Sequence, residues 1–170
     1  MAQTKQQKVE VVKKLEDAFK TAATTVFVHF KGVNITEETQ MRRELRGADV
    51  KYTVAKKTLI KRALESLGHK ADDVPMDGEI ALAYGGGDDV TAPARLIHEY
   101  GKKFLNAKKE AKLFLVGGLF EGKLIGQALM QEIALIPSMQ GLRGMFANVI
   151  NSPIQRFAIA LSEVGKTKGA

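Results

Sequence analysis

The sequence contains no cysteine and no tryptophan among its 170 residues. The absence of cysteine excludes disulfide bonds, thiolate metal ligands and cysteine nucleophiles. No apolar run approaches the roughly 18 residues that a membrane-spanning helix requires. Residues 1–5 lack the apolar region of a signal peptide. We therefore expect a cytoplasmic, bacterial-type location and no contact with a membrane.

Motifs for catalysis and cofactor binding are also scarce. The runs Gly85-Gly86-Gly87 and Gly117-Gly118 lack the lysine and hydroxyl residue that end a nucleotide-binding loop, so they predict turns. Asp88-Asp89 precede a predicted helix and are expected to cap it. The three histidines show no ligand spacing. We predict no catalytic residue, no metal and no cofactor. A small enzyme using the glycine loops is an alternative that nucleotide-dependent melting would reveal.

The composition allows a folded core and an uneven charge. Apolar residues make up 45% of the chain, which is enough to bury a core. The net charge of +7 divides into +7 for residues 1–70, −3 for 71–137 and +3 for 138–170. A basic segment in a small protein favours nucleic acid as a partner. The alternative is a solvated, lysine-rich surface.

Hydrophobic periodicity predicts alternating helices and strands. Helices are expected over about 5–23, 36–46, 57–67, from Thr91 to about 104, and 127–134. Strands are expected over about 26–30, 50–54, 79–84, 113–120 and 124–125. Thr36 is expected to cap the second helix, with Ile35, Met41 and Leu45 facing inward. Gly68 is expected to end the third helix, and Thr91 to cap the fourth. The fold class is α/β (α+β): a mixed or antiparallel sheet flanked by helices, with a long C-terminal helical extension.

Positive charge concentrates on two predicted helices and the strand between them. The cations are Lys51, Lys56, Lys57, Lys61 and Arg62, preceded by Arg42, Arg43 and Arg46 and joined by Lys5, Lys8 and Lys31. Helices that flank one edge of the sheet would gather these side chains into a phosphate-binding patch. Aromatic residues are few here (Phe30, Tyr52), which favours a folded RNA recognised by shape.

The C-terminal stretch, from Ser138 to about Lys166, is predicted to be a separate amphipathic helix that begins after Pro137. A first apolar stripe precedes Asn151-Ser152-Pro153, which is expected to interrupt the helix, and a second stripe follows. The stripes are Leu142, Met145, Phe146, Val149 and Ile150, then Ile154, Phe157, Ala158, Leu161 and Val164. Phe146 and Phe157 are eleven residues apart, or three turns plus about 20°, so the stripes are expected on nearly the same face.

A helix of this length is roughly 43 Å long, longer than a small domain, so its apolar face needs a partner. Two similar segments suggest two copies of one partner. The alternatives are packing on this chain's own domain, a homodimeric coiled coil, and a membrane-surface helix. The last is disfavoured because the segment lacks tryptophan and its polar face is not lined with lysine.

Five blocks resemble a known family. They are Phe30-Lys31-Gly32-Val33-Asn34-Ile35 with Met41-Arg42-Arg43-Glu44-Leu45-Arg46, Val54-Ala55-Lys56-Lys57-Thr58-Leu59-Ile60-Lys61-Arg62-Ala63, Asp77-Gly78-Glu79-Ile80-Ala81-Leu82-Ala83-Tyr84, Gly117-Gly118 with Gly122-Lys123-Leu124-Ile125, and Leu135-Ile136-Pro137-Ser138. In this order they resemble bacterial large-subunit ribosomal protein ten, the stalk-base family, over essentially the whole chain.

The resemblance implies a non-enzymatic ribosomal protein. Residues 1–137 would bind large-subunit rRNA beside ribosomal protein eleven, with Gly32, Arg42, Arg46, Lys56 and Thr58 on the RNA-side motifs. Residues 138–170 would carry dimers of the acidic stalk protein, ribosomal protein twelve, which recruit translational GTPases. Two stripes imply two dimers. A generic RNA-binding scaffold is the alternative. Lys57 departs from the family's usual asparagine, and Glu38 stands where an apolar residue is common.

Overall fold

A computed structural model of the chain describes residues 5–69, 78–85, 87, 89–104 and 111–168. It divides into two compact units, Met1–Ile136 and Pro137–Ala170. Together these units contain helices flanking one sheet and a long C-terminal helix, so the predicted fold class is confirmed.

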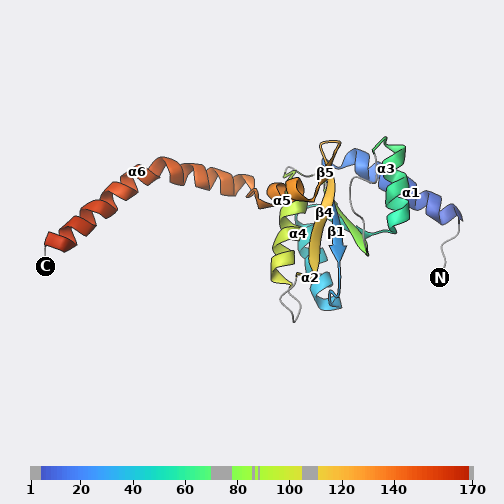
Figure 1. Cartoon of the computed structure of the whole chain (residues 1–170), viewed down its shortest axis with the longest axis horizontal. Helices are drawn as coiled ribbons and strands as arrows, with labels where there is room; N and C mark the ends of the chain where they lie inside the picture. Colours follow the sequence, from blue (N-terminus) through green and yellow to red (C-terminus); the bar gives the residue numbers. More distant parts are fainter. Residues whose placement is uncertain (1–4, 70–77, 86, 88, 105–110, 169–170) are drawn as a thin grey trace. The chain divides into compact units, whose positions relative to one another are not determined.

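The first unit alternates helices and strands in the order that the sequence predicts (Figure 1). Its helices are α1 (Lys5–Thr21), α2 (Ile35–Gly47), α3 (Lys57–Ser66), α4 (Ala92–Lys103) and α5 (Gln127–Leu135). Its strands are β1 (Thr24–Phe30), β2 (Val50–Val54), β3 (Ile80–Gly85), β4 (Leu113–Phe120) and β5 (Lys123–Gly126).

The five strands form one antiparallel sheet in the order β2-β3-β1-β4-β5. Strand β1 lies between β3 and β4, so it pairs with two strands that do not follow it directly in the chain. A tight turn at Glu121 and Gly122 joins β4 to β5, as predicted. The prediction of a turn at Gly117-Gly118 is wrong, because both glycines lie within β4. A β-carbon on Gly118 would overlap the carbonyl oxygen of Thr25, so only glycine allows β4 to lie this close to β1. In the strand order given above, β2 lies at one edge of the sheet.

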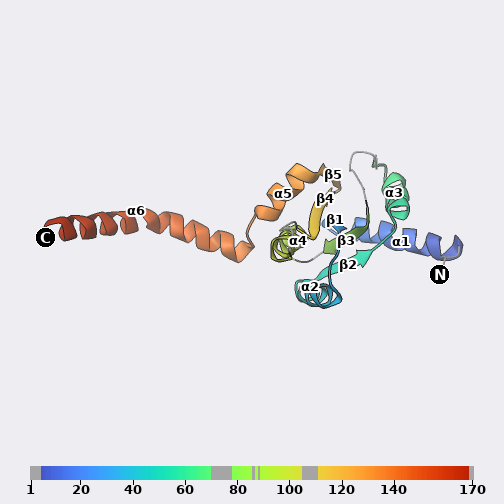
Figure 2. The same ribbon diagram turned by 60° about the horizontal axis from the view of Figure 1, so that its bottom comes forward.

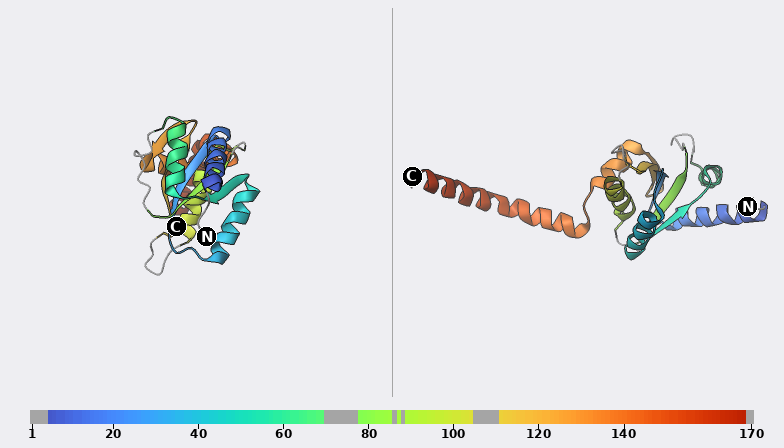
Figure 3. Two further views of the ribbon diagram at one scale, coloured as in Figure 1. Left: turned by 90° about the vertical axis from the view of Figure 1, so that its right-hand side faces the viewer. Right: turned by 90° about the horizontal axis from the view of Figure 1, so that it is seen from below.

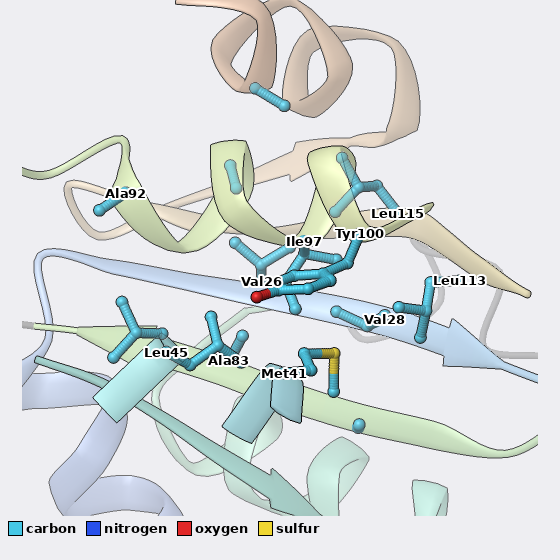
Figure 4. Close-up of a cluster of buried hydrophobic side chains, with 14 of the residues drawn as sticks. Val26, Val28, Met41, Leu45, Ala83, Ala92, Ile97, Tyr100, Leu113 and Leu115 are labelled. Carbon is cyan, nitrogen blue, oxygen red and sulfur yellow. The ribbon is translucent and has the colours of Figure 1, made fainter. Parts of the chain in front are cut away.

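Helices cover both faces of this sheet (Figures 2 and 3). On β1, Val26 and Val28 face α2, α4 and α5, while Phe27 faces α1 and α3. Figure 4 shows Ile97 and Tyr100 of α4 directed toward Val26 and Val28. The alternation gives the unit two apolar clusters, one on each side of the sheet.

Helix termini follow local capping rules, with one correction. Asn34, not Thr36, is the N-cap of α2, because its backbone N–H donates to the Glu37 carboxylate at 3.0 Å in a capping box. Ile35 then lies in the first turn with 84% of its surface exposed, so the expected inward orientation of Ile35 is wrong. Met41 and Leu45 are buried as expected.

Two further helix ends agree with the sequence. Gly68, with φ of 82°, ends α3, where the N–H of His69 donates to the Leu64 carbonyl at 3.0 Å. Thr91 is the N-cap of α4, and Asp89 supports it by accepting from the Thr91 N–H at 3.2 Å and by pairing with Arg95 at 2.8 Å. Burial favours the protonated Asp89, but the bonds from Arg95 and Thr91 outweigh it and lower the pKa. Asp88 and Gly86 lie outside the described residues.

The second unit is a single helix, α6 (Met139–Lys168). Ser138 caps it as predicted: its carbonyl accepts from the Leu142 N–H at 2.8 Å, and its hydroxyl accepts from the Gly141 N–H at 3.3 Å. The expected interruption at Asn151-Ser152-Pro153 is wrong, because the helix continues through Pro153. Figure 1 shows α6 bending along its length, which is how a helix accommodates an internal proline.

Candidate nucleic-acid interface and docking helix

Strand β2, at the edge of the sheet, separates two groups of basic side chains. Helix α2 packs on one face of the sheet and α3 on the other. Lys51 lies directly opposite Tyr84 of β3, and its side chain shares a face with Thr53. Tyr52 points to the other face, toward α2. Cations from α2 and α3 therefore reach the same sheet edge from opposite sides.

Arg42 of α2 is held by two neighbours. Its guanidinium donates to the Glu38 carboxylate from Nε at 3.1 Å and from NH2 at 2.6 Å. The same group lies over the Tyr52 ring, 5.2 Å from its centroid. Burial raises the pKa of Tyr52 to about 12, with the Glu38 charge adding to the effect, so this ring stays neutral near pH 7. Glu38 is therefore the ion-pair partner of Arg42, and Tyr52 supports the same guanidinium from β2.

A small cationic cavity lies beside this arginine. Its volume is about 210 Å³, and it is lined by Arg42, Arg46, Lys51, Tyr52, Thr53 and Tyr84. No carboxylate of the described residues lines it. Three cations with two tyrosine rings and a threonine hydroxyl suit an anion such as a phosphate. We call this feature the small cavity.

A larger cavity opens on the α3 side of β2 and shares Thr53 and Tyr84 with the small cavity. Lys56, Lys57 and Thr58 line it from the start of α3, together with Lys14 of α1. The first turn of α3 has no acidic residue and no side-chain cap, so its backbone N–H groups add positive potential. We call this feature the large cavity.

The other predicted cations lie outside both cavities. Lys8, Arg43 and Arg62 are exposed on α1, α2 and α3, and Lys61 is half-buried on α3. Lys31 and Gly32 follow β1, where the Lys31 N–H donates to the Lys112 carbonyl at 2.9 Å and Gly32 has a φ of 68°. Lys5 begins α1, but its side chain lies outside the described part of the structure.

Lys112, a residue that the sequence reasoning missed, supports the loop before α2. Its ammonium donates to both oxygens of Glu37 at 2.8 Å. Its hydrogen bond is the main reason that the pKa of Glu37 is lowered, and the Asn34 N–H lowers it further. The spacing of Asn34 and Glu37 is a capping-box signal, but no local pattern points to Lys112.

The ten apolar residues predicted to bind a partner are all exposed on α6. The exposed fraction of the nine larger side chains ranges from 39% at Leu142 to 70% at Ile154. Because the helix is continuous, the stripes can be compared at 100° per residue, which centres the second roughly 90° around the helix from the first. The expectation of nearly one face is therefore corrected: the segments present different, overlapping faces. Ile159, 58% exposed, points away from both stripes.

Two features are absent from the described residues: a metal-binding cluster and a membrane-spanning helix. No group of three or more histidine and carboxylate side chains among them could hold a metal ion. In the same part of the chain, no helix combines the length and apolar character needed to cross a membrane. The fold defines the class: an α/β protein with one antiparallel sheet between helices and a long, exposed C-terminal helix.

Comparison with known proteins gives the family. The family model for ribosomal protein L10 matches residues 3–102. The chain is 34% identical over 168 residues to the large ribosomal subunit protein uL10 of Shouchella clausii, covering 99% of this chain and 97% of the relative. It is 33% identical to uL10 of Lacticaseibacillus casei, covering 95% of this chain and 92% of the relative. The uL10 of Staphylococcus carnosus is 32% identical, covering 95% and 93%.

The chain belongs to the ribosomal protein L10 family. It is a structural, non-enzymatic component of the large ribosomal subunit and part of a ribonucleoprotein that carries out translation. The predicted family is confirmed.

Proposed function

We propose that residues 1–137 bind large-subunit rRNA and that residues 138–170 dock dimers of the acidic stalk protein. Through those dimers the chain would recruit translational GTPases, beside ribosomal protein eleven, on the cytoplasmic ribosome. The two parts of the proposal rest on different observations, one on the sheet edge and one on α6.

The RNA-binding proposal rests on the convergence of cations from three helices on the edge strand β2. These cations are Lys14, Arg42, Arg46, Lys51, Lys56 and Lys57. Within the described chain, Arg42 is the member of this set with an ion-pair partner, Glu38. Folding therefore brings together positive charges that, apart from Arg42, have no ion-pair partner among the described residues. The phosphate backbone of RNA is a polyanion that would neutralise them. Arginine supplies bidentate forks and lysine supplies point charges.

A salt titration tests the RNA proposal. Each phosphate neutralised contributes roughly 0.7–0.9 to the slope of log affinity against log salt concentration. We expect Arg46→Gln to reduce this slope by about one such increment and to weaken binding of large-subunit rRNA. The matched control is Arg143→Gln on α6, which should leave both values unchanged. An affinity insensitive to salt would overturn the proposal.

The docking proposal rests on the exposed apolar side chains of α6. A helix that lies free in water with this many exposed apolar residues is stabilised by a partner that covers them. The segment also carries a net charge of +3, which complements an acidic partner. Two stripes centred on different faces provide two sites, and a dimer at each would bring the total to two dimers per chain. Sedimentation of the full chain with the acidic stalk protein tests whether a complex forms.

A further inference from the structure

The large cavity has an apolar interior. Its volume is about 710 Å³, within the range of about 300–1,000 Å³ in which proteins bind small organic groups. Leu15, Leu59 and Ile80 are buried beneath it, and Val11 and Ala55 are half-buried in its wall. The half-buried ring of Tyr84 also lines it, whereas the ring of Phe30 packs with the apolar cluster on the opposite face of the sheet. A phosphate alone would gain nothing from these groups, so the interior suits a flat apolar group.

The exposed side chains that line the same cavity are mainly cationic. Lys14, Lys56 and Lys57 are exposed, and none has an ion-pair partner among the residues that the structure describes. Among the lining residues that the structure describes, Glu79 is the one carboxylate. The exposed hydroxyl of Thr58 offers a donor and an acceptor beside the lysines. An apolar interior beneath a cationic rim matches a flat heterocycle attached to an anion.

A nucleotide of RNA has this composition. Bases that are not paired in an RNA fold are bound by stacking on aromatic and apolar side chains, while lysine and arginine neutralise the adjoining phosphates. Thr53 and Tyr84 line both the large and the small cavity, so the two cavities are neighbours and one strand could reach both. We propose that the large cavity holds one unstacked base of the large-subunit rRNA, with its flanking phosphates on Lys56 and Lys57.

This inference rests on the proposed RNA binding and adds a contact that charge alone does not provide. The sequence suggested recognition by shape because aromatic residues are few. The fold changes that expectation, since it places the ring of Tyr84, from strand β3, in the lining of a cavity that also contains apolar residues of α1 and α3. The chain would therefore read one unpaired position of the RNA as well as its overall shape.

Filling the cavity without changing its charge tests the proposal. Ala55→Leu adds volume to the wall, and Val54→Met does so independently in case the first variant folds poorly. The matched control, Ala128→Leu, makes the same change at an exposed position on α5 outside the lining. We expect the filled variants to bind purified large-subunit rRNA roughly tenfold more weakly than the native chain, with an unchanged salt slope.

The outcomes separate the two proposals. If the native chain shows no salt-dependent affinity for rRNA, the proposed function fails and the base site fails with it. If the native chain binds and the filled variants bind equally well, only the base site is overturned. Weaker binding with a reduced salt slope would also overturn it, because that result means that phosphate contacts were lost and no base was displaced.

Discussion

The ammonium of Lys112 lies 2.8 Å from both carboxylate oxygens of Glu37, a residue 75 positions earlier in the chain. The side chains are 11% and 26% exposed, so water only partly screens the pair. The pair joins the residue before β4 to the first turn of α2. Because Glu37 also caps α2, this contact fixes the loop that contains Gly32 and sets the start of the helix that carries Arg42 and Arg46.

We predict that Lys112→Met lowers stability, and that the loss depends on pH. The pKa of Glu37 in the folded chain lies below its ordinary value of 4.5, chiefly because of Lys112. The pair therefore contributes fully above pH 4.5, and its contribution is lost as the pH falls through the folded pKa. Urea midpoints measured from pH 7 down to 3 should show the largest difference from the native chain at neutral pH.

The control for this experiment is Lys123→Met, which removes an exposed lysine on β5. It should leave the midpoint unchanged at every pH. A difference between the native chain and Lys112→Met that stays constant into acid would show that the ion pair is not the cause.

We predict that Glu38→Gln strengthens rRNA binding about fivefold. The Glu38 carboxylate holds Arg42 at 2.6 Å, where it competes with a phosphate for the same guanidinium. The Tyr52 ring still supports Arg42 after the charge is removed. A gain of roughly 1 kcal/mol is typical for removing a nearby unfavourable charge at a solvated surface. Filter binding at fixed salt measures it, with Glu132→Gln on α5 as the charge-matched control. Weaker binding by Glu38→Gln would mean that Glu38 is required to position Arg42.

Local patterns in the sequence predicted most of the elements. Periodicity located β4 and α4, and Gly68 and Ser138 marked helix ends, because these signals depend on a few neighbouring residues. The prediction failed at Ile35, because a capping box at Asn34, two residues before the predicted cap Thr36, set the start of the helix. The predicted interruption at Pro153 also failed. Proline removes one backbone hydrogen bond, and this loss need not end a helix when the residues on both sides stay helical.

The candidate site was predictable only in part. The cations of α2 and α3 could be grouped because they lie close together in sequence. Their separation into two cavities could not, because it depends on β3 pairing with β2 and on α1 packing against α3. Lys14 lines the large cavity, and Lys112 pairs with Glu37, only because distant segments of the chain pack together. A single sequence carries no signal for such contacts.

We predict that Pro153→Ala raises the helicity of the free chain. A proline inside a helix costs about 3 kcal/mol relative to alanine, and Pro153 lies near the middle of α6. Far-ultraviolet circular dichroism of the full chain during heating should show later melting of helix. Asn151→Ala, at an exposed position in the same helix, should have a much smaller effect. Equal effects would indicate that Pro153 does not weaken the helix.

We predict that Phe157→Asp removes one dimer of the acidic stalk protein and leaves rRNA binding intact. Phe157 is 66% exposed and is the aromatic residue of the second stripe, so its loss should weaken that site by about 2 kcal/mol or more, roughly 30-fold. The control is Ile159→Asp, an equally charged change at an exposed position that points away from both stripes. Loss of rRNA binding together with the dimer would show that the helix belongs to the RNA-binding unit.

Native mass spectrometry of the full chain with the acidic stalk protein measures partner identity and copy number together. Two apolar segments on different faces of one continuous helix lead us to expect a complex of one chain with two dimers. Single substitutions in either stripe should reduce it to one dimer. Failure to form a complex, or a complex with any other number of copies, would contradict the proposed role of α6.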